Sequence, residues 1–146
     1  EIESWWVRIA APMAGATRGM QFLPEVNDEV LVAFEHGDIH RPYIVGYLWS
    51  NTDKPPMDVA TSVSGGKVAQ RMIKTTTAHT KTLADKAGEE LVSIKTKSGH
   101  QFFLDDKSGS EKISIIDKTG SNKMVIDSTK NSMTINVGGD FSVTAT

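Results

Sequence analysis

From residue 73 onward, apolar and polar residues alternate in short stretches that are separated by corners bearing Gly, Asp or Ser. Apolar side chains occupy every second position in 92–94, 113–115 and 133–137. A period of two places successive side chains on opposite faces of an extended chain. The pattern therefore predicts short β-strands, each with one apolar and one polar face.

These stretches belong to a repeat of 21 residues. Segments 73–93 and 94–114 align without a gap, and ten of the 21 positions are identical, including His79/His100. A third, looser copy opens at Ile115. Each copy holds two strands, and a fixed period near 20 residues indicates a stacked, quasi-one-dimensional architecture.

The last copies depart slightly from the repeat. The alternation shifts by one position near residue 122, which predicts a longer corner there. Beyond Gly138 and Gly139, the alternating stretch 141–144 predicts one further strand.

The apolar face of these strands needs a cover. At roughly 1.5–3 kcal/mol per buried side chain, leaving it in water would forgo a few tens of kcal/mol, and the pattern shows no amphipathic helix to pack on it. Either the strands close into a solenoid within one chain, or the stripes of several chains meet about a common axis. Only two strands are visible per unit, which favours several chains, most simply three. The predicted trimer core comprises Val92, Ile94, Phe102, Leu104, Ile113, Ile115, Met124, Ile126, Met133, Ile135, Val137, Phe141 and Val143.

The first 50 residues have a different organisation. Gly, Pro and Asp turns separate four apolar stretches that predict short strands, and 14–19 predicts a flexible loop; the predicted strands are 5–11, 20–23, 30–34 and 41–49. Such a set is typical of a small β-barrel or sandwich. We therefore expect an all-β chain with three parts: a barrel that lacks its first strand at 1–50, a linker at 51–66 and a repeat domain at 67–146.

Composition narrows the classes of function. The 146 residues contain no cysteine, which excludes disulfides and thiolate metal sites, and carry a formal charge of −2. This near-neutral charge argues against a general nucleic-acid binder. No apolar run is long enough for a membrane-spanning helix. No signal-peptide pattern is visible, and the chain starts at Glu1 inside an apparent strand, so we expect further residues upstream.

Several ordered motifs carry a family resemblance. They are WVRIAAPMAG at 6–15, MQFLPEVNDEVLVAFEHGD at 20–38, RPYIVGYLWS at 41–50, DKPP at 53–56, IKTKSGHQFFLDD at 94–106 and EKISIIDKTGSNKMVIDS at 111–128. Together they resemble the spike proteins of contractile injection systems: the VgrG proteins of type VI secretion and the baseplate spikes of tailed phages and phage-tail-like particles.

The resemblance implies an OB-fold barrel followed by an intertwined, homotrimeric β-helical prism that pierces membranes. It also implies a hub and inner tube as partners, a PAAR-like tip protein or an effector at the C-terminal end, and transient contact with a target membrane. The spike would be assembled in the bacterial cytoplasm and delivered into a target envelope. It implies no cofactor and no nucleic acid.

Some features depart from the family. The first repeat has Lys81 and Thr82 at the positions of Phe102 and Phe103 in the second repeat. We therefore expect the base of the needle to be more hydrated or less regular than its middle. Some phage members carry a muramidase between barrel and needle, and the residues 50–66 are too few for one. No His-x-His pair near residue 146 offers an apical metal site.

Two sets of histidines are candidate metal ligands. His36, Asp38 and His40 alternate, so they could coordinate zinc from one side of a strand; the alternative, which we favour, is a solvated turn with Gly37 in the left-handed region. His79 and His100 could form an ion-binding ladder, but histidines at strand corners more often make hydrogen bonds.

Acidic and aromatic residues offer two further readings. Five aspartates could be hydrolytic acids, but glycosidase chemistry needs two carboxyl groups across a cleft, and neighbouring lysines favour solvated corners instead; they are Asp85, Asp105, Asp106, Asp117 and Asp127. Four aromatic residues could stack bases or sugars on an OB fold, although core or subunit packing is the simpler reading; they are Trp5, Trp6, Tyr47 and Trp49. We therefore expect no enzyme. The competing classes are a trimeric tail fibre or adhesin stalk and an OB-type binding module.

Overall fold

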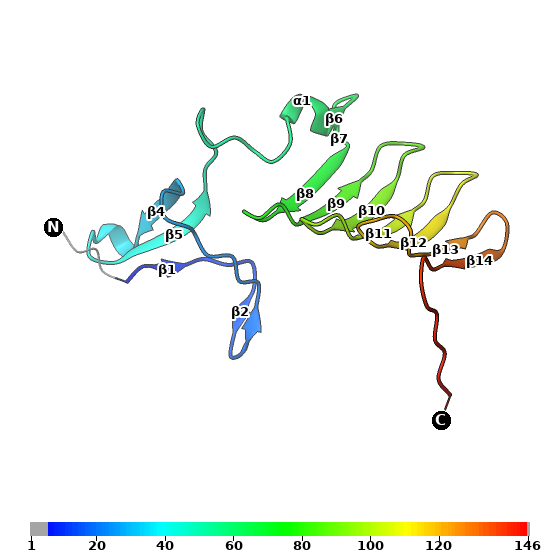
Figure 1. Cartoon of the computed structure of the whole chain (residues 1–146). Coiled ribbons are helices and arrows are strands. Elements are labelled where there is room, and N and C mark those ends of the chain that lie inside the picture. Colours follow the sequence, from blue (N-terminus) through cyan, green and yellow to red (C-terminus); the bar gives the residue numbers. More distant parts are fainter. Residues whose placement is uncertain (1–5, 146) are drawn as a thin grey trace. The chain divides into compact units, whose positions relative to one another are not determined.

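The computed structural model describes residues 6–145, whose regular secondary structure is almost entirely β-strand (Figure 1). The chain divides into two compact units, 1–55 and 56–146. The first unit contains the predicted barrel residues, and the second contains the repeats. Among the described residues, no helix is long and apolar enough to cross a bilayer.

The first unit is built on a three-stranded sheet in the order β1-β5-β4. β1 (Arg8–Ile9) runs parallel to β5 (Pro42–Tyr47), which is antiparallel to β4 (Val30–Phe34). Because β5 lies between two neighbours, its Ile44 is buried. The single-turn 3-10 helix η1 (Glu35–Gly37) joins β4 to the turn before β5.

Two predictions for this unit are wrong. The predicted flexible loop at 14–19 is a tight hairpin of β2 (Ala14–Gly15) and β3 (Arg18–Gly19). The predicted strand at 20–23 is not a strand, because its polar backbone groups find other partners. The Met20 N–H donates to the Met13 carbonyl over 2.9 Å, and the Tyr47 hydroxyl donates to the Phe22 carbonyl over 2.8 Å.

The predicted linker 51–66, which lies between the two sheets in the sequence, contains some regular structure. A single helical turn, α1 (Val59–Ser62), begins at Asp58, whose side chain accepts a hydrogen bond from the Ala60 N–H over 2.8 Å. This is a standard N-cap. β6 (Val63–Ser64) and β7 (Lys67–Val68) then form a small hairpin that leads into the repeats.

The second unit is one seven-stranded sheet in which every strand pairs with its sequence neighbour, in the order β14-β13-β12-β11-β10-β9-β8 (Figure 1). The strands are β8 (Gln70–Lys74), β9 (Thr80–Ala84), β10 (Leu91–Lys95), β11 (Gln101–Asp105), β12 (Lys112–Ile116), β13 (Lys123–Asp127) and β14 (Ser132–Asn136). Corners this short permit only antiparallel neighbours. The sheet stays open, so the alternative of a solenoid closed within one chain is wrong.

The repeat therefore corresponds to two strands and two corners. The prediction of a longer corner near residue 122 is confirmed, because 117–122 has one residue more than 75–79 and 96–100. The predicted strand at 141–144 is wrong: nothing after β14 is paired as a strand up to residue 145. Gly138 and Gly139 interrupt the alternation, and residues 140–145 do not return to pair with the free edge of β14.

Candidate functional site: an uncovered apolar sheet face

The register of the large sheet gathers most of its apolar residues on one face. Paired residues of successive strands form a row across the sheet, in which Ile94 aligns with Phe102 and Phe102 with Ile115. A second row is formed by the residues that lie two positions away in each strand. Because alternate residues share a face, both rows lie on the same side of the sheet. The first row is Ile73, Lys81, Ile94, Phe102, Ile115, Met124 and Ile135; the second is Arg71, Leu83, Val92, Leu104, Ile113, Ile126 and Met133.

Ten of the thirteen residues predicted for the trimer core lie in these two rows. Val137 follows β14 with the same parity, and Phe141 and Val143 lie beyond the sheet. The register shows a shared apolar face, and the assignment of that face to a trimer core stays a prediction.

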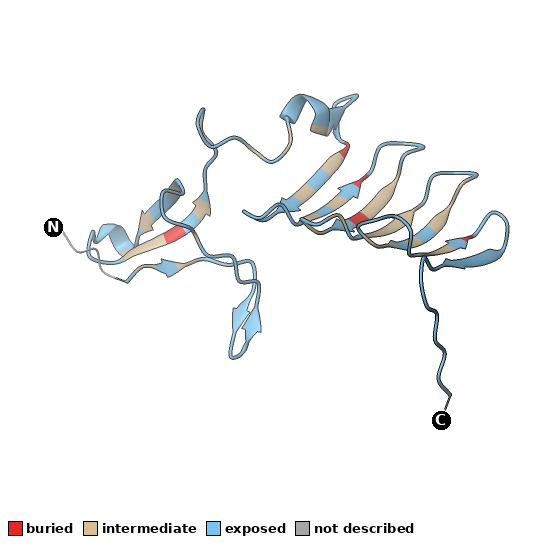
Figure 2. Cartoon of the chain, in the orientation of Figure 1, coloured by how far each residue is buried: buried red, intermediate tan, exposed pale blue. Residues whose placement is uncertain are grey.

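Nothing within the described residues of the second unit covers this face (Figure 2). Ile115 retains 51% and Ile135 45% of the exposure of a free side chain, and the only buried apolar residues among those described are Ile44, Ala69 and Ala84. A contiguous apolar face that its own unit leaves exposed marks an interaction site.

The β8–β9 end of the sheet interrupts the apolar face with charge. Arg71 and Lys81 occupy positions where later repeats have Val, Ile or Phe, and the Arg71 guanidinium bonds to Asp85. Thr82 lies on the opposite, polar face. The sequence comparison between repeats therefore located a real break in the apolar face at its β8–β9 end.

The corners lie along two borders of the sheet, at opposite ends of the strands. The histidine border holds 75–79, 96–100 and 117–122, and the acidic border holds 85–90, 106–111 and 128–131. In the first two corners of the histidine border, a threonine side chain accepts the histidine N–H four residues later. His79 donates to Thr75 over 3.1 Å, and His100 donates to Thr96 over 3.0 Å. The third corner makes the same closure with Asp117, which accepts from the Asn122 N–H over 3.1 Å.

The same three corners are also linked to their successors. His79 Nδ1 accepts from the Lys97 N–H over 3.4 Å, and His100 Nδ1 accepts from the Lys118 N–H over 3.2 Å. In the third corner, Asn122 Oδ1 likewise accepts a hydrogen bond from the Gly138 N–H over 2.8 Å. The hydrogen-bonding interpretation of His79 and His100 is thus confirmed. The sequence signal was their identity at equivalent repeat positions, whereas the role of Asn122 had no such signal.

One corner carries backbone strain. Ala78 has φ of +67°, a left-handed conformation, where the second repeat has Gly99 at φ of +102°. Left-handed backbone costs a non-glycine residue about 1–2 kcal/mol, of which about 0.4–1 kcal/mol is offset by the greater unfolded-state entropy of glycine.

Exchanging these residues should therefore move stability in opposite directions. We expect Ala78→Gly to stabilise the protein by about 1 kcal/mol and Gly99→Ala to destabilise it by a similar amount. Thermal unfolding followed by circular dichroism measures both. A Cβ at position 99 would meet Lys118 atoms at ordinary contact distances of 3.8 Å, so steric overlap does not confound the test. Equal effects of the same sign would contradict this explanation.

The acidic border contains most of the candidate hydrolytic acids. Asp85 and Asp106 lie in its corners, and Asp105 and Asp127 are the last residues of the strands that lead into them. Asp117 lies on the opposite border, where it bonds to Thr119 and Asn122 of its own corner. Asp85 bonds to Arg71, and Asp105 accepts from the Lys107 N–H over 3.0 Å. The Asp105 bond closes a corner and the Asp85 bond reaches back to β8, and neither sets two carboxyl groups across a cleft.

Asp127 is the most enclosed of these acids, at 8% exposure. The Thr129 hydroxyl donates to it over 2.6 Å and holds the pKa of its carboxyl below the ordinary value of 3.8, against the opposing effect of burial. The Lys130 N–H and the ammonium groups of Lys130 and Lys112 act with Thr129.

This environment predicts an acid-dependent contribution to stability. A pKa lowered by folding stabilises the fold above pH 3.8, and the contribution is lost as pH falls through the folded-state value. We expect Asp127→Asn to melt at a lower temperature near pH 7 and to approach the wild-type melting temperature below pH 3.8. Asp53→Asn, at an exposed position outside the sheet, is the control. A deficit that is constant at every pH would contradict the role of ionisation.

The candidate zinc ligands of the first unit do not converge. His40 Nδ1 lies 3.1 Å from Asp38 Oδ1, but His36 sits in the η1 turn at φ of +51°. Within residues 6–145, no three histidine, aspartate or glutamate side chains are placed to share a metal ion. Gly37 has φ of +78°, so the interpretation as a turn with left-handed Gly37 is confirmed.

The aromatic candidates are exposed in this chain. Trp6 is fully exposed, Trp49 is 69% exposed, and the Tyr47 hydroxyl bonds to the Phe22 carbonyl; Trp5 lies outside the described residues. Packing of Trp6 and Trp49 in a core of their own chain is therefore wrong. Packing against another subunit stays a prediction.

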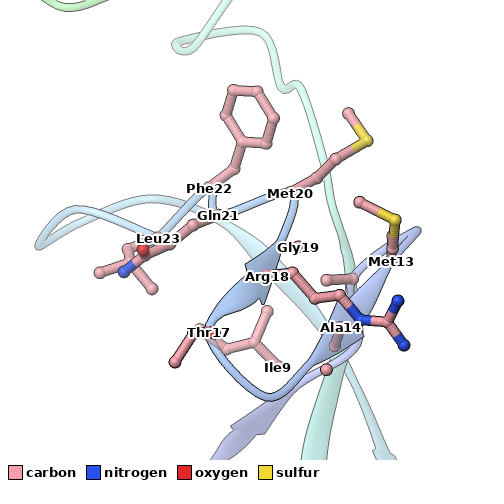
Figure 3. Close-up of a pocket in the computed structure, with 12 residues that line it drawn as sticks. Ile9, Met13, Ala14, Thr17, Arg18, Gly19, Met20, Gln21, Phe22 and Leu23 are labelled. Carbon is pink, nitrogen blue, oxygen red and sulfur yellow. The ribbon is translucent and has the colours of Figure 1, made fainter.

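A shallow hollow of about 600 Å³ lies between the β2–β3 hairpin and the segment that follows it (Figure 3). Met13, Met20, Phe22 and Leu23 line it with apolar atoms, and Arg18 is its only charged lining residue. One cation among apolar groups provides no acid–base pair. The hollow adds to the exposed apolar surface and does not resemble an active site.

Comparison with known proteins identifies relatives of the first unit. Residues 1–49 match the family of type VI secretion system/phage-baseplate injector OB domains. The chain is 34% identical over 56 residues to the type VI secretion system spike protein VgrG2a of Pseudomonas aeruginosa, a match that covers 38% of this chain and 7% of that protein. It is 39% identical over 56 residues to the spike protein VgrG3 of Vibrio cholerae, covering 38% and 6%. It is 38% identical over 56 residues to the actin cross-linking toxin VgrG1 of V. cholerae, covering 38% and 5%.

The first unit is thus an injector OB domain. The resemblance seen in the motifs is confirmed for the first unit, whose residues 1–49 match the injector OB domain shared by type VI secretion and phage-baseplate spike proteins. The aligned stretch is a small part of each of these relatives.

Proposed function

We propose that this chain is a non-enzymatic part of the membrane-piercing spike of a contractile injection system. In this role three copies assemble with their apolar sheet faces inward and form a needle below the OB domains. The observation that carries the proposal is an injector OB domain followed, in the same chain, by a sheet whose apolar face has no cover.

The function that follows is mechanical. Rows of apolar side chains interdigitated about an axis at the density of a protein interior resist compression. Hydrogen bonds between strands and between successive corners, such as His100 to the Lys118 N–H, tie each layer to the next along the needle. The outward face is mostly polar, with lysine, serine and threonine beside a few apolar residues such as Phe103 and Val125. This polar majority would disfavour lasting insertion into a bilayer that the needle crosses briefly.

The proposal extends to partners and location. The OB domains would contact the hub and inner tube of the particle, and the end beyond β14 would carry a PAAR-like tip protein or an effector. Assembly would take place in the bacterial cytoplasm before delivery into a target envelope. Neither a cofactor nor a nucleic acid is part of this proposal.

Sedimentation equilibrium of the purified chain tests the central step. We expect a single species of three times 15.9 kDa with a strong β signal in circular dichroism. A folded monomer would overturn the proposal and would favour the alternative of an OB-type binding module. A trimer that fails to bind the isolated inner-tube protein would favour a fibre or adhesin stalk.

A further inference from the structure

The two borders of the large sheet carry opposite charge. The strand ends and corners of the histidine border (74–80, 95–101 and 116–123) contain five lysines and one aspartate. Those of the acidic border (84–91, 105–112 and 127–132) contain seven carboxylates and four lysines. The sheet is therefore polarised across its width, although the chain as a whole is near neutral.

Much of this charge has no partner within the described chain. No carboxylate lies within ion-pair distance of the lysines of the histidine border, which are Lys74, Lys95, Lys97, Lys118 and Lys123. On the acidic border, Asp127 pairs with Lys112 and Lys130, and Glu89 pairs with Lys86. Glu90, Asp105, Asp106 and Glu111 are left without an ion pair.

From this polarity we infer that each copy joins the next with its histidine border against the acidic border of its neighbour. The inference rests on the proposed trimer. When sheets are related by rotation about an axis along their stacking direction, each border must face the opposite border of the next copy. Lysines without partners then meet carboxylates without partners at every seam.

The corners also fit together without any shift along the axis. Corners of the histidine border follow β8, β10 and β12, whereas those of the acidic border follow β9, β11 and β13. With strands about 4.8 Å apart, corners on one border recur every 9.6 Å or so and are offset by half that spacing from corners on the other border. Under pure rotation, corners of one copy fall between corners of the next.

Charge reversal at one border, at both, or at neither tests this pairing in the full chain. The first variant carries Lys97→Glu and Lys118→Glu, the second Glu90→Lys and Asp106→Lys, and the third all four changes. Each single-border variant should lower the trimer association constant by about tenfold or more at low salt, because like charges then meet at all three seams. The third variant should recover, since opposite charges face each other again.

The control matched to the first variant is Lys54→Glu with Arg18→Glu, which lowers the net charge by the same amount in the first unit. The third variant, whose net charge is unchanged, controls for net charge itself. Sedimentation at several protein concentrations measures association, and 1 M salt should remove most of the differences. A trimeric wild type with unaffected single-border variants, or a four-fold variant that does not recover, would overturn the seam pairing and leave the trimer intact. A monomeric wild type would overturn both.

Discussion

Ile135→Asp and Ile115→Asp should each abolish the proposed trimer while leaving the chain soluble. Both isoleucines lie in the first apolar row, one near the end of the sheet and one near its middle. Three-fold symmetry would bring three carboxylates together on the axis, and each buried unpaired charge costs several kcal/mol. Gel filtration with light scattering should find only monomer at concentrations where the wild type is trimeric.

Thr134→Asp is the matched control for Ile135→Asp. It introduces the same charge one residue away, in the same strand, but on the polar face. We expect it to assemble like the wild type. A normal trimer from both isoleucine variants would exclude the apolar face as the interface, and loss of assembly by all three would point to general disruption of β14.

Lys81→Phe should produce the largest gain in stability. Lys81 lies in the first apolar row between Ile73 and Ile94, and the second repeat has Phe102 at the equivalent position. The change would remove three ammonium groups from the proposed axis and bury a phenyl ring from each chain. Burial of such a side chain stabilises by roughly 1.5–3 kcal/mol, so the melting temperature of the trimer should rise clearly.

The neighbouring change Thr82→Phe tests whether the stabilisation depends on which face of the sheet carries the new phenyl ring or only on the added hydrophobicity. Thr82 also aligns with a phenylalanine of the second repeat but lies on the polar face. We expect it to leave the melting temperature of the trimer close to that of the wild type. A higher melting temperature for Thr82→Phe than for Lys81→Phe would show that the wrong face has been assigned to the interior.

The repeats were predictable from sequence because one physical rule governs them. Alternation fixes the face of each side chain, and the repeat length fixes where the corners fall, so both the strands and the break at Lys81 could be located. The longer corner before β13 was visible as a shift in parity.

Other features depend on partners that a local pattern does not contain. The segments 20–23 and 141–144 alternate like strands but join no sheet: the first bonds to Met13 and Tyr47, and the second does not return to the free edge of β14. The Asn122 contact depends on a residue 16 positions later. The sequence alone identified the candidate interface as an apolar stripe. The opposite charges of the two borders became visible only once the strand register showed which corners lie on the same side of the sheet.

The two-strand repeat also gives the family a simple way to change reach. Inserting one 21-residue copy would lengthen the shaft by about 9.6 Å and leave every later residue on its original face, because two strands and two corners restore the starting direction. Deleting one strand with its corner would instead exchange the borders of everything downstream. Shaft length should therefore vary among such proteins in increments of whole strand pairs.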